Sequence, residues 1–239
     1  MPINHVNPLL YMQANLQQYQ SEGILQGPQL EIITPSVEVI GMPMDGEAIM
    51  RHLEGAIRTA YKSEDKIGPD SHIKILKHIL SLKHESTLEH VSMSFRIITN
   101  RGVSHELVRH RLASYTQEST RYVSYAKKAP KLILPWHLID RAQQEKTFWF
   151  MSHINILGFY LKAVEDLKWK PQDARGFLPN DIKTEVVMTM NLRSLRNFLM
   201  LRTAAAAHPD MQVIAREILR IMYELVPLLF EDIQGRLAA

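Results

Sequence analysis

The sequence predicts one domain that combines helices with strands, and three observations support this fold class. The chain has 239 residues, of which 46% are hydrophobic, and this is enough for one sizeable core. Residues 91–97 and 186–190 alternate apolar and polar side chains as half-buried strands do, whereas other stretches repeat apolar residues at helical spacing. The sequence contains no internal repeat, low-complexity linker or sharp change of composition, so a single domain is the economical interpretation.

The composition excludes several kinds of site. The chain has no cysteine, so disulfides, thiolate zinc sites and a thiol nucleophile are ruled out. A net charge of +3 is only mildly basic and suits small anionic ligands as well as nucleic acid. The sequence has no apolar run of the about 18 residues that a membrane span needs, and its N-terminus lacks a signal-peptide pattern. We therefore expect a cytoplasmic protein with no membrane association.

The first part of the chain, residues 1–28, is polar and rich in glutamine. We expect it to be an extension that is loose or docks on a partner subunit, followed by one domain over residues 29–239. Residues 30–40 are rich in β-branched side chains, which predicts a strand that is interrupted at Pro35.

Helical spacing and capping residues predict the helices of the domain. The predicted helices cover about residues 45–60, 70–80, 102–109, 137–168, 191–202 and 209–225, with a short one from Pro171 and a break at Pro227. In the long helix we expect a buried stripe that contains Phe148, Met151, Ile154, Leu157 and Leu161. Residues 127–136 contain two prolines and predict a connector.

The segment His84–His90 contains two histidines and two glutamates, which raises the question of a metal site. A zincin helix needs its second histidine four positions after the first, and Leu88 occupies that position. We therefore predict no metal here. A polar loop that faces a ligand, or that satisfies buried backbone groups, is the favoured interpretation.

The run from Arg109 to Tyr122 concentrates arginines and hydroxyl side chains. We interpret it as a helix end that passes into extended chain, where alternate residues share a face. Arg109 would then point with Arg111, and Ser119 with Arg121. Guanidinium groups and hydroxyls bind phosphate well, so the run predicts an anion site. The alternative is a solvated basic turn after a helix.

The predicted helix 191–202 presents a second set of polar groups. Arg193 and Asn197 lie four residues apart and share a face, and Arg202 lies about 140° round the helix from Asn197. Leucines form the buried stripe. These residues either bind a ligand or form the solvent face of an amphipathic helix.

Four motifs together resemble one enzyme family, the flavin-dependent thymidylate synthases. Arg109-His110-Arg111, seven residues and then Ser119 match its RHR-x7-S signature, and residues 84–90 resemble its H-E-[ST]-x-x-E-H segment. Residues 174–179 resemble its A-R-x-x-L-P turn, and residues 191–202 its second ligand-binding helix. The motifs occur in the order typical of the family over about residues 30–225.

This resemblance implies an α+β fold, the thymidylate synthase-complementing-protein fold. A twisted, mainly antiparallel sheet is flanked by helices in a single domain. It also implies a homotetramer with active sites shared between subunits. The implied reaction is reductive methylation of dUMP to dTMP, with methylenetetrahydrofolate as carbon donor and FAD reduced by NADPH as hydride source.

The resemblance also implies site residues. The implied FAD contacts are Ser86, Arg109, His110, Arg111, Asn191, Arg193 and Asn197. The implied dUMP contacts are Glu106, Leu107, Val108, Arg109, Gln117, Glu118, Ser119, Thr120, Arg121, Arg175 and Arg202. Arg202 is the expected catalytic residue, because its cation can stabilise negative charge on the uracil ring as the N3 proton is lost.

Two departures from the family pattern and two rival functions remain. The family often has Asn-Glu where this chain has Thr116-Gln117, and a polar, histidine-containing segment where it has four alanines at 204–207.

One rival is an enzyme that acts on another pyrimidine nucleotide such as dCMP. The other is a nucleic-acid-binding module, which the tyrosines within the basic run suggest. Ser119 could be proposed as a nucleophile, but no adjacent base is evident, so a binding role is preferred.

Overall fold

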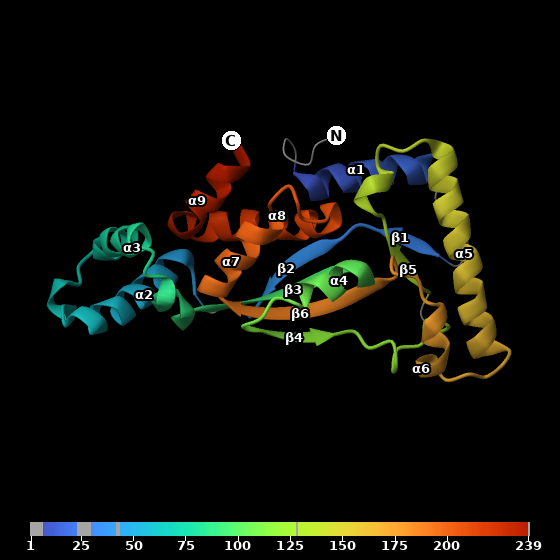
Figure 1. The fold of residues 1–239 in the computed structure, drawn as a ribbon, viewed down its shortest axis with the longest axis horizontal. Coiled ribbons are helices and arrows are strands. Elements are labelled where there is room, and N and C mark those ends of the chain that lie inside the picture. Colours follow the sequence, from blue (N-terminus) through green and yellow to red (C-terminus); the bar gives the residue numbers. More distant parts are fainter. Residues whose placement is uncertain (1–6, 23–29, 42–43, 128, 239) are drawn as a thin grey trace.

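The computed structural model describes residues 7–22, 30–41, 44–127 and 129–238, and it contains a four-stranded antiparallel sheet with helices packed around it (Figure 1). The strand order of this sheet is β2-β3-β6-β4. These strands span Ser36–Ile40, Ser92–Asn100, Lys183–Asn191 and Ala113–Gln117 respectively. The predicted α+β fold with a mainly antiparallel sheet is confirmed.

The two central strands, β3 and β6, are those that the alternating patterns predicted. They pair in antiparallel register, with Phe95 opposite Met188. One face of this pair is buried, and it is formed by the apolar residues Met93, Phe95, Ile97, Val186, Met188 and Met190. Period-two alternation therefore identified both the strands and the face that packs against the core.

One continuous core joins that buried face to five of the longer helices, which lie above the sheet and beyond its left end in Figure 1. They are α2 Gly46–Tyr61, α3 Ser71–Ser81, α7 Leu192–Arg202, α8 Pro209–Leu225 and α9 Pro227–Ala238. Asp45 caps α2 as predicted, since its Oδ1 accepts a hydrogen bond from the Ala48 amide at 2.8 Å. Asn191 caps α7 in the same way. The predicted break at Pro227 separates α8 from α9.

A second apolar cluster contains the N-terminal helix α1, Pro8–Ser21, and the long helix α5, Gln143–Glu165. Besides Pro8, the buried side chains of α1 are Leu9, Met12, Leu16 and Tyr19, and the Tyr19 hydroxyl donates to the carbonyl of Ile139. The described part of the extension is thus a helix packed on its own chain. The helical spacing of these four apolar residues was not recognised in the sequence, because glutamines lie between them. Residues 1–6 and 23–28 of the extension lie outside the described residues.

The predicted stripe of α5 is confirmed in part, because Leu157 is buried and Ile154 and Leu161 are partly buried against the same cluster. Phe148 and Met151 are wrong, since they are 75% and 49% exposed, and Trp149, His153 and Tyr160 face inward instead. Four large apolar residues stand in a row at 148–151, so spacing alone could not show that Trp149 and Phe150 are the buried ones. Trp149 is held inward because its Nε1 donates to the Asp181 carboxylate at 2.8 Å. The helix also begins at Gln143, six residues later than expected.

The predicted connector at 127–136 contains a strand that the sequence analysis missed. Strand β5, Lys131–Ile133, pairs in parallel with β1, Glu31–Ile33, in a small second sheet. Pro130 and Pro135 flank this strand and do not interrupt it. Pro35 separates β1 from β2, as predicted. Among the described helices, none is both long and apolar enough to cross a membrane.

Candidate active site

The basic run follows the short helix α4, Arg101–Leu107, which begins at a capping side chain on the end of β3. The Asn100 Oδ1 accepts from the Val103 amide at 2.7 Å. After α4 the chain turns and enters the sheet as β4. Leu112 has a φ of +59°, a left-handed conformation that L residues rarely adopt.

This turn corrects one prediction about the arginines. Arg109 and Arg111 lie in the turn between α4 and β4, and Ser119 and Arg121 lie beyond the end of β4. None of the four is in extended strand, so the alternate-residue argument for their common direction does not hold. The predicted passage from helix end to extended chain is confirmed, but the extended part is only Ala113–Gln117.

Tyr115 holds the turn in place, which the sequence analysis did not foresee. Its hydroxyl lies 2.9 Å from the carbonyl oxygens of both Leu107 and His110, to which it donates. Burial raises the pKa of this tyrosine to about 12, so the hydroxyl keeps its proton at neutral pH.

Arg202, the last residue of α7, meets the end of α4. Its Nη1 lies 3.0 Å from Oε2 of Glu106, and its Nε donates to Nε2 of His110 at 2.7 Å. His110 and Arg202 belong to two different motifs and lie 92 residues apart in the sequence. These two motifs therefore meet within one chain. The contact fixes the direction of the guanidinium from two sides.

His110 must be neutral to make this contact, because a guanidinium only donates hydrogen bonds and Nε2 must therefore accept. Burial lowers the pKa of His110, and the adjacent Arg202 cation lowers it further. The edge of the imidazole packs against the Phe198 ring at a centroid distance of 4.9 Å. A neutral histidine is thus built into the junction of α4 and α7.

The neutral His110 at this junction should make the stability of the fold decrease in acid. Because the folded-state pKa of His110 is depressed, unfolded chains bind more protons than folded ones as the pH falls below the ordinary histidine value. We expect the melting temperature to fall between pH 7 and pH 5, and to fall less in His110→Gln, whose carbonyl oxygen can accept from Arg202. Melting curves at several pH values test this. Equal pH dependence in the two proteins would contradict it.

The segment 84–90 lies against α7 as the 3-10 turn η2, Glu85–His90. The Arg193 Nη1 lies 2.6 Å from Oε1 of Glu89. Ser86 on this turn and Asn197 on α7 are both exposed, so residues from two motifs border the same surface. Among the described residues, no group of histidine and carboxylate side chains is arranged to hold a metal ion.

The surroundings of this surface suit a polyanionic ligand such as a dinucleotide. Arg109 and Arg111 are exposed, and neither forms an ion pair with any residue in the described ranges. Cations without carboxylate partners match the charge of a pyrophosphate group. The donor set, with Ser86, Arg193 and Asn197, therefore fits the implied FAD.

The polar residues at the end of β4 contact their own chain. The Gln117 Nε2 donates to the hydroxyls of Ser104 and Thr184, at 2.9 and 3.0 Å. The Glu118 carboxylate lies 2.7 Å from the Lys183 ammonium and accepts from the Tyr125 hydroxyl at 3.0 Å. These bonds fix the loop that follows. Thr120 on this loop is buried.

Ser119 and Arg121 lie toward one end of β6, away from α7. Strand β4 pairs so that Ala113 lies opposite Met190 and Gln117 opposite Val186. The loop after β4 therefore continues toward Lys183, whereas α7 starts at the other end of β6, after Asn191. The two ends are roughly 26 Å apart, since a strand rises 3.3 Å per residue.

Arg175 also lies away from α7. It begins the 3-10 turn η4, Arg175–Phe177, directly after helix α6, Pro171–Ala174. Figure 1 shows α6 far from α7, near the part of the chain that follows β4. The implied site residues thus fall into two groups in one chain. One group surrounds α7 and includes Arg202, and the other comprises Ser119, Arg121 and Arg175.

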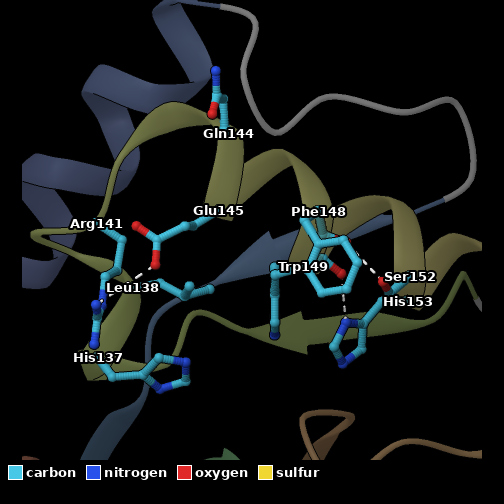
Figure 2. Close-up of a pocket in the computed structure, with 9 residues that line it drawn as sticks. All are labelled: His137, Leu138, Arg141, Gln144, Glu145, Phe148, Trp149, Ser152 and His153. Atoms are coloured by element: carbon cyan, nitrogen blue, oxygen red, sulfur yellow. Dashed lines mark hydrogen bonds and ion pairs between the residues drawn. The ribbon is translucent and has the colours of Figure 1, made fainter.

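A hollow of about 590 Å³ lies elsewhere, along the first half of α5 (Figure 2). Its lining includes Phe148, Trp149 and His153, and none of the sequence-predicted site residues. The His153 Nε2 lies 3.3 Å from the Asp181 carboxylate that also accepts from Trp149. This hollow is separate from the candidate site.

Comparison with known proteins gives a consistent result. Residues 47–228 match the family model described as thymidylate synthase complementing protein. A flavin-dependent thymidylate synthase of Geobacter sulfurreducens is 34% identical over 70% of this chain and 72% of its own length. One from Sulfurisphaera tokodaii is 32% identical over 82% of this chain and 76% of its own.

Solved structures share the fold. The UMP/dUMP methylase PolB from Streptomyces cacaoi, bound with 5-Br dUMP, gives a TM-score of 0.70 at 22% identity, over 86% of this chain and 97% of that one. Thymidylate synthase X from Helicobacter pylori, with FAD and dUMP, gives 0.65 at 25% identity, over 83% and 98%. The family model and the relatives together show that this chain belongs to the thymidylate synthase complementing protein family, the flavin-dependent thymidylate synthases.

Proposed function

We propose that this protein catalyses the reductive methylation of dUMP to dTMP, with methylenetetrahydrofolate as carbon donor and FAD reduced by NADPH as hydride source. The observation that supports this most strongly is the Arg202 guanidinium held between Glu106 and His110 where two family motifs meet. The names of the relatives support it, as does the Helicobacter pylori structure with FAD and dUMP.

The flavin side of the site would be the surface around α7. FAD, when bound, supplies the redox chemistry, and the protein binds and orients it. Arg109 and Arg111 would neutralise the pyrophosphate, while Arg193, Ser86 and Asn197 add hydrogen bonds. His110 uses Nε2 on Arg202, so its protonated Nδ1 is the atom it can offer to the cofactor. Asn191 would contribute through the helix start that it caps.

Arg202 would act on the uracil ring. Its planar cation can stabilise the negative charge that develops on the pyrimidine as the N3 proton leaves. Glu106 and His110 hold the guanidinium before substrate arrives, so little reorganisation is needed. This arrangement lets the enzyme polarise the ring without the covalent thiolate that a chain lacking cysteine cannot provide.

The nucleotide phosphate would be bound by the second group of residues. Arg121 and Arg175 are exposed cations, and Ser119 adds a hydroxyl beside them. The Ser119 Oγ accepts a hydrogen bond from the Arg121 amide at 3.3 Å, and no described side chain is bonded to it as a base. We therefore assign Ser119 to binding and not to nucleophilic attack.

The separation of the two groups along β6 supports shared active sites. A nucleotide bound by Arg175 and polarised by Arg202 requires those residues to come from different subunits, because one chain holds them at opposite ends of the sheet (Figure 1). We propose a homotetramer in which one subunit supplies the α7 group and its neighbour supplies the phosphate group.

Mixed variants test this arrangement. Arg175→Ala and Arg202→Ala should each be nearly inactive alone. Co-expressed, they should regain roughly a quarter of wild-type turnover, because random mixing leaves that fraction of sites with both arginines. Turnover of the purified mixed oligomer, compared with each variant, is the measurement. Mixed oligomers that stay inactive would contradict shared sites.

Product identification tests the substrate. The purified enzyme is incubated with FAD, NADPH and methylenetetrahydrofolate, and with dUMP or dCMP in separate reactions. We expect the mass of dTMP to appear from dUMP and no methylated product from dCMP. Methylation of dCMP alone would assign the protein to a different pyrimidine nucleotide.

A further inference from the structure

A buried arginine outside the proposed ligand contacts joins three elements of the fold. Arg196 lies on α7 and is 4% exposed. Its Nε and Nη2 donate to Oε1 of Glu85 at 3.2 and 3.1 Å. Its Nη1 and Nη2 donate to the two Asp232 oxygens at 2.9 and 2.8 Å, and Nη1 also donates to the Leu229 carbonyl.

These contacts use the full donor capacity of the guanidinium, which has five N–H groups. Arg196 therefore has no donor left for a ligand. Its partners lie on η2 and on the C-terminal helix α9, so the side chain ties both to α7. Lysine could not replace it, because one ammonium cannot bridge two carboxylates with this planar geometry.

Glu85 directly precedes Ser86, the residue of this turn proposed to contact FAD. Four residues later, Glu89 is bound by Arg193 one turn before Arg196 on α7. The turn is thus held at both ends by ion pairs, and Leu88 is its only fully buried described residue. Leu88 anchors the middle of the turn in the main core, and the two arginines fix the polar residues on either side of it.

We propose that Arg196 is a positioning residue for the flavin side of the site, and that Asp232 on α9 sets its orientation. This inference rests on the proposed function. Removing one carboxylate would leave a buried cation incompletely paired and release Glu85 from a fixed place. The C-terminal helix would then control flavin affinity through Arg196, although α9 itself contributes no proposed flavin contact.

The experiment measures FAD dissociation in variants of Asp232, whose side chain is 50% exposed. Flavin-loaded enzyme is diluted, and the released FAD is followed by its fluorescence. Asp232→Asn should weaken FAD binding about tenfold, whereas Asp232→Glu, which keeps the carboxylate, should bind as the wild type does. Glu85→Gln should weaken binding in the same direction.

Turnover separates positioning from general damage. At saturating FAD, Asp232→Asn should recover near wild-type kcat with an unchanged KM for dUMP. The matched control is Tyr19→Phe, which removes a buried hydrogen bond of α1 in the second apolar cluster. It should lower the melting temperature without changing FAD affinity.

Two results would overturn the inference. One is wild-type FAD affinity in Asp232→Asn, and the other is equal weakening in Asp232→Asn and Tyr19→Phe for the same loss of melting temperature. A wild-type protein that binds no FAD would contradict the proposed function itself, and the inference would fail with it. Normal wild-type binding with an unaffected Asp232→Asn overturns the inference alone.

Discussion

Arg202→Ala will lower kcat by about 10²–10³-fold while the enzyme keeps its flavin. The substitution removes the cation that we propose stabilises charge on the pyrimidine, and it leaves Glu106 without its ion-pair partner. The proposed flavin contacts on η2 and the other face of α7 are untouched. The measurement compares turnover with the absorbance of bound flavin in the same preparation.

Arg202→Lys is the matched control for this prediction. It keeps one positive charge but loses the planar group that bonds both Glu106 and His110, so we expect it to recover only a small part of the activity. An alanine variant that loses flavin and turnover to the same extent would contradict the role assigned to Arg202.

Gly46→Ala will destabilise the protein by about 3 kcal/mol, because a Cβ at this position has no room. An added Cβ would lie 1.9 Å from the carbonyl oxygen of Leu225, where the start of α2 meets the end of α8. Backbone, not a flexible side chain, blocks the space, so the two helices must move apart. Thermal or denaturant unfolding measures the loss.

Gly55 in the same helix provides the control. An added Cβ there meets nothing within 4 Å, and alanine favours a helix interior by about 1 kcal/mol over glycine. Gly55→Ala should therefore be at least as stable as the wild type. Similar stabilities for the two alanine variants would contradict the close approach of α2 and α8.

Local patterns predicted the parts of the fold that depend on local physics. The alternation in β3 and β6 identified a buried face. Asp45 and Asn191 were recognised as caps because such side chains accept hydrogen bonds from the free amides at the start of a helix. The order and identity of the motifs led to the correct family. The strands, the caps and each single motif depend on residues within a few positions of one another.

The features that were missed depend on contacts between distant segments. Trp149 faces inward because its indole N–H donates a hydrogen bond to Asp181, and no spacing within α5 shows this. The φ of Leu112 places the arginines in a turn, although a leucine gives no sign of a left-handed conformation. Arg196 resembled any helix arginine, since its partner Glu85 lies 111 residues away.

The division of the proposed site residues into two groups could also not be predicted from the sequence. It follows from the register of β4 on β6, which places Gln117 opposite Val186 and directs the next residues away from α7. The sequence shows that Ser119 follows Arg111 by a few residues. It does not show that a strand carries the two apart.

The central claim is that arginine, serine and asparagine side chains around α7 bind a flavin, and the absorption spectrum of the protein as isolated tests it most directly. We expect a yellow protein with the visible bands of oxidised flavin that bleach when NADPH is added. A colourless protein that takes up no FAD, and whose affinity for DNA falls steeply with salt, would contradict the account.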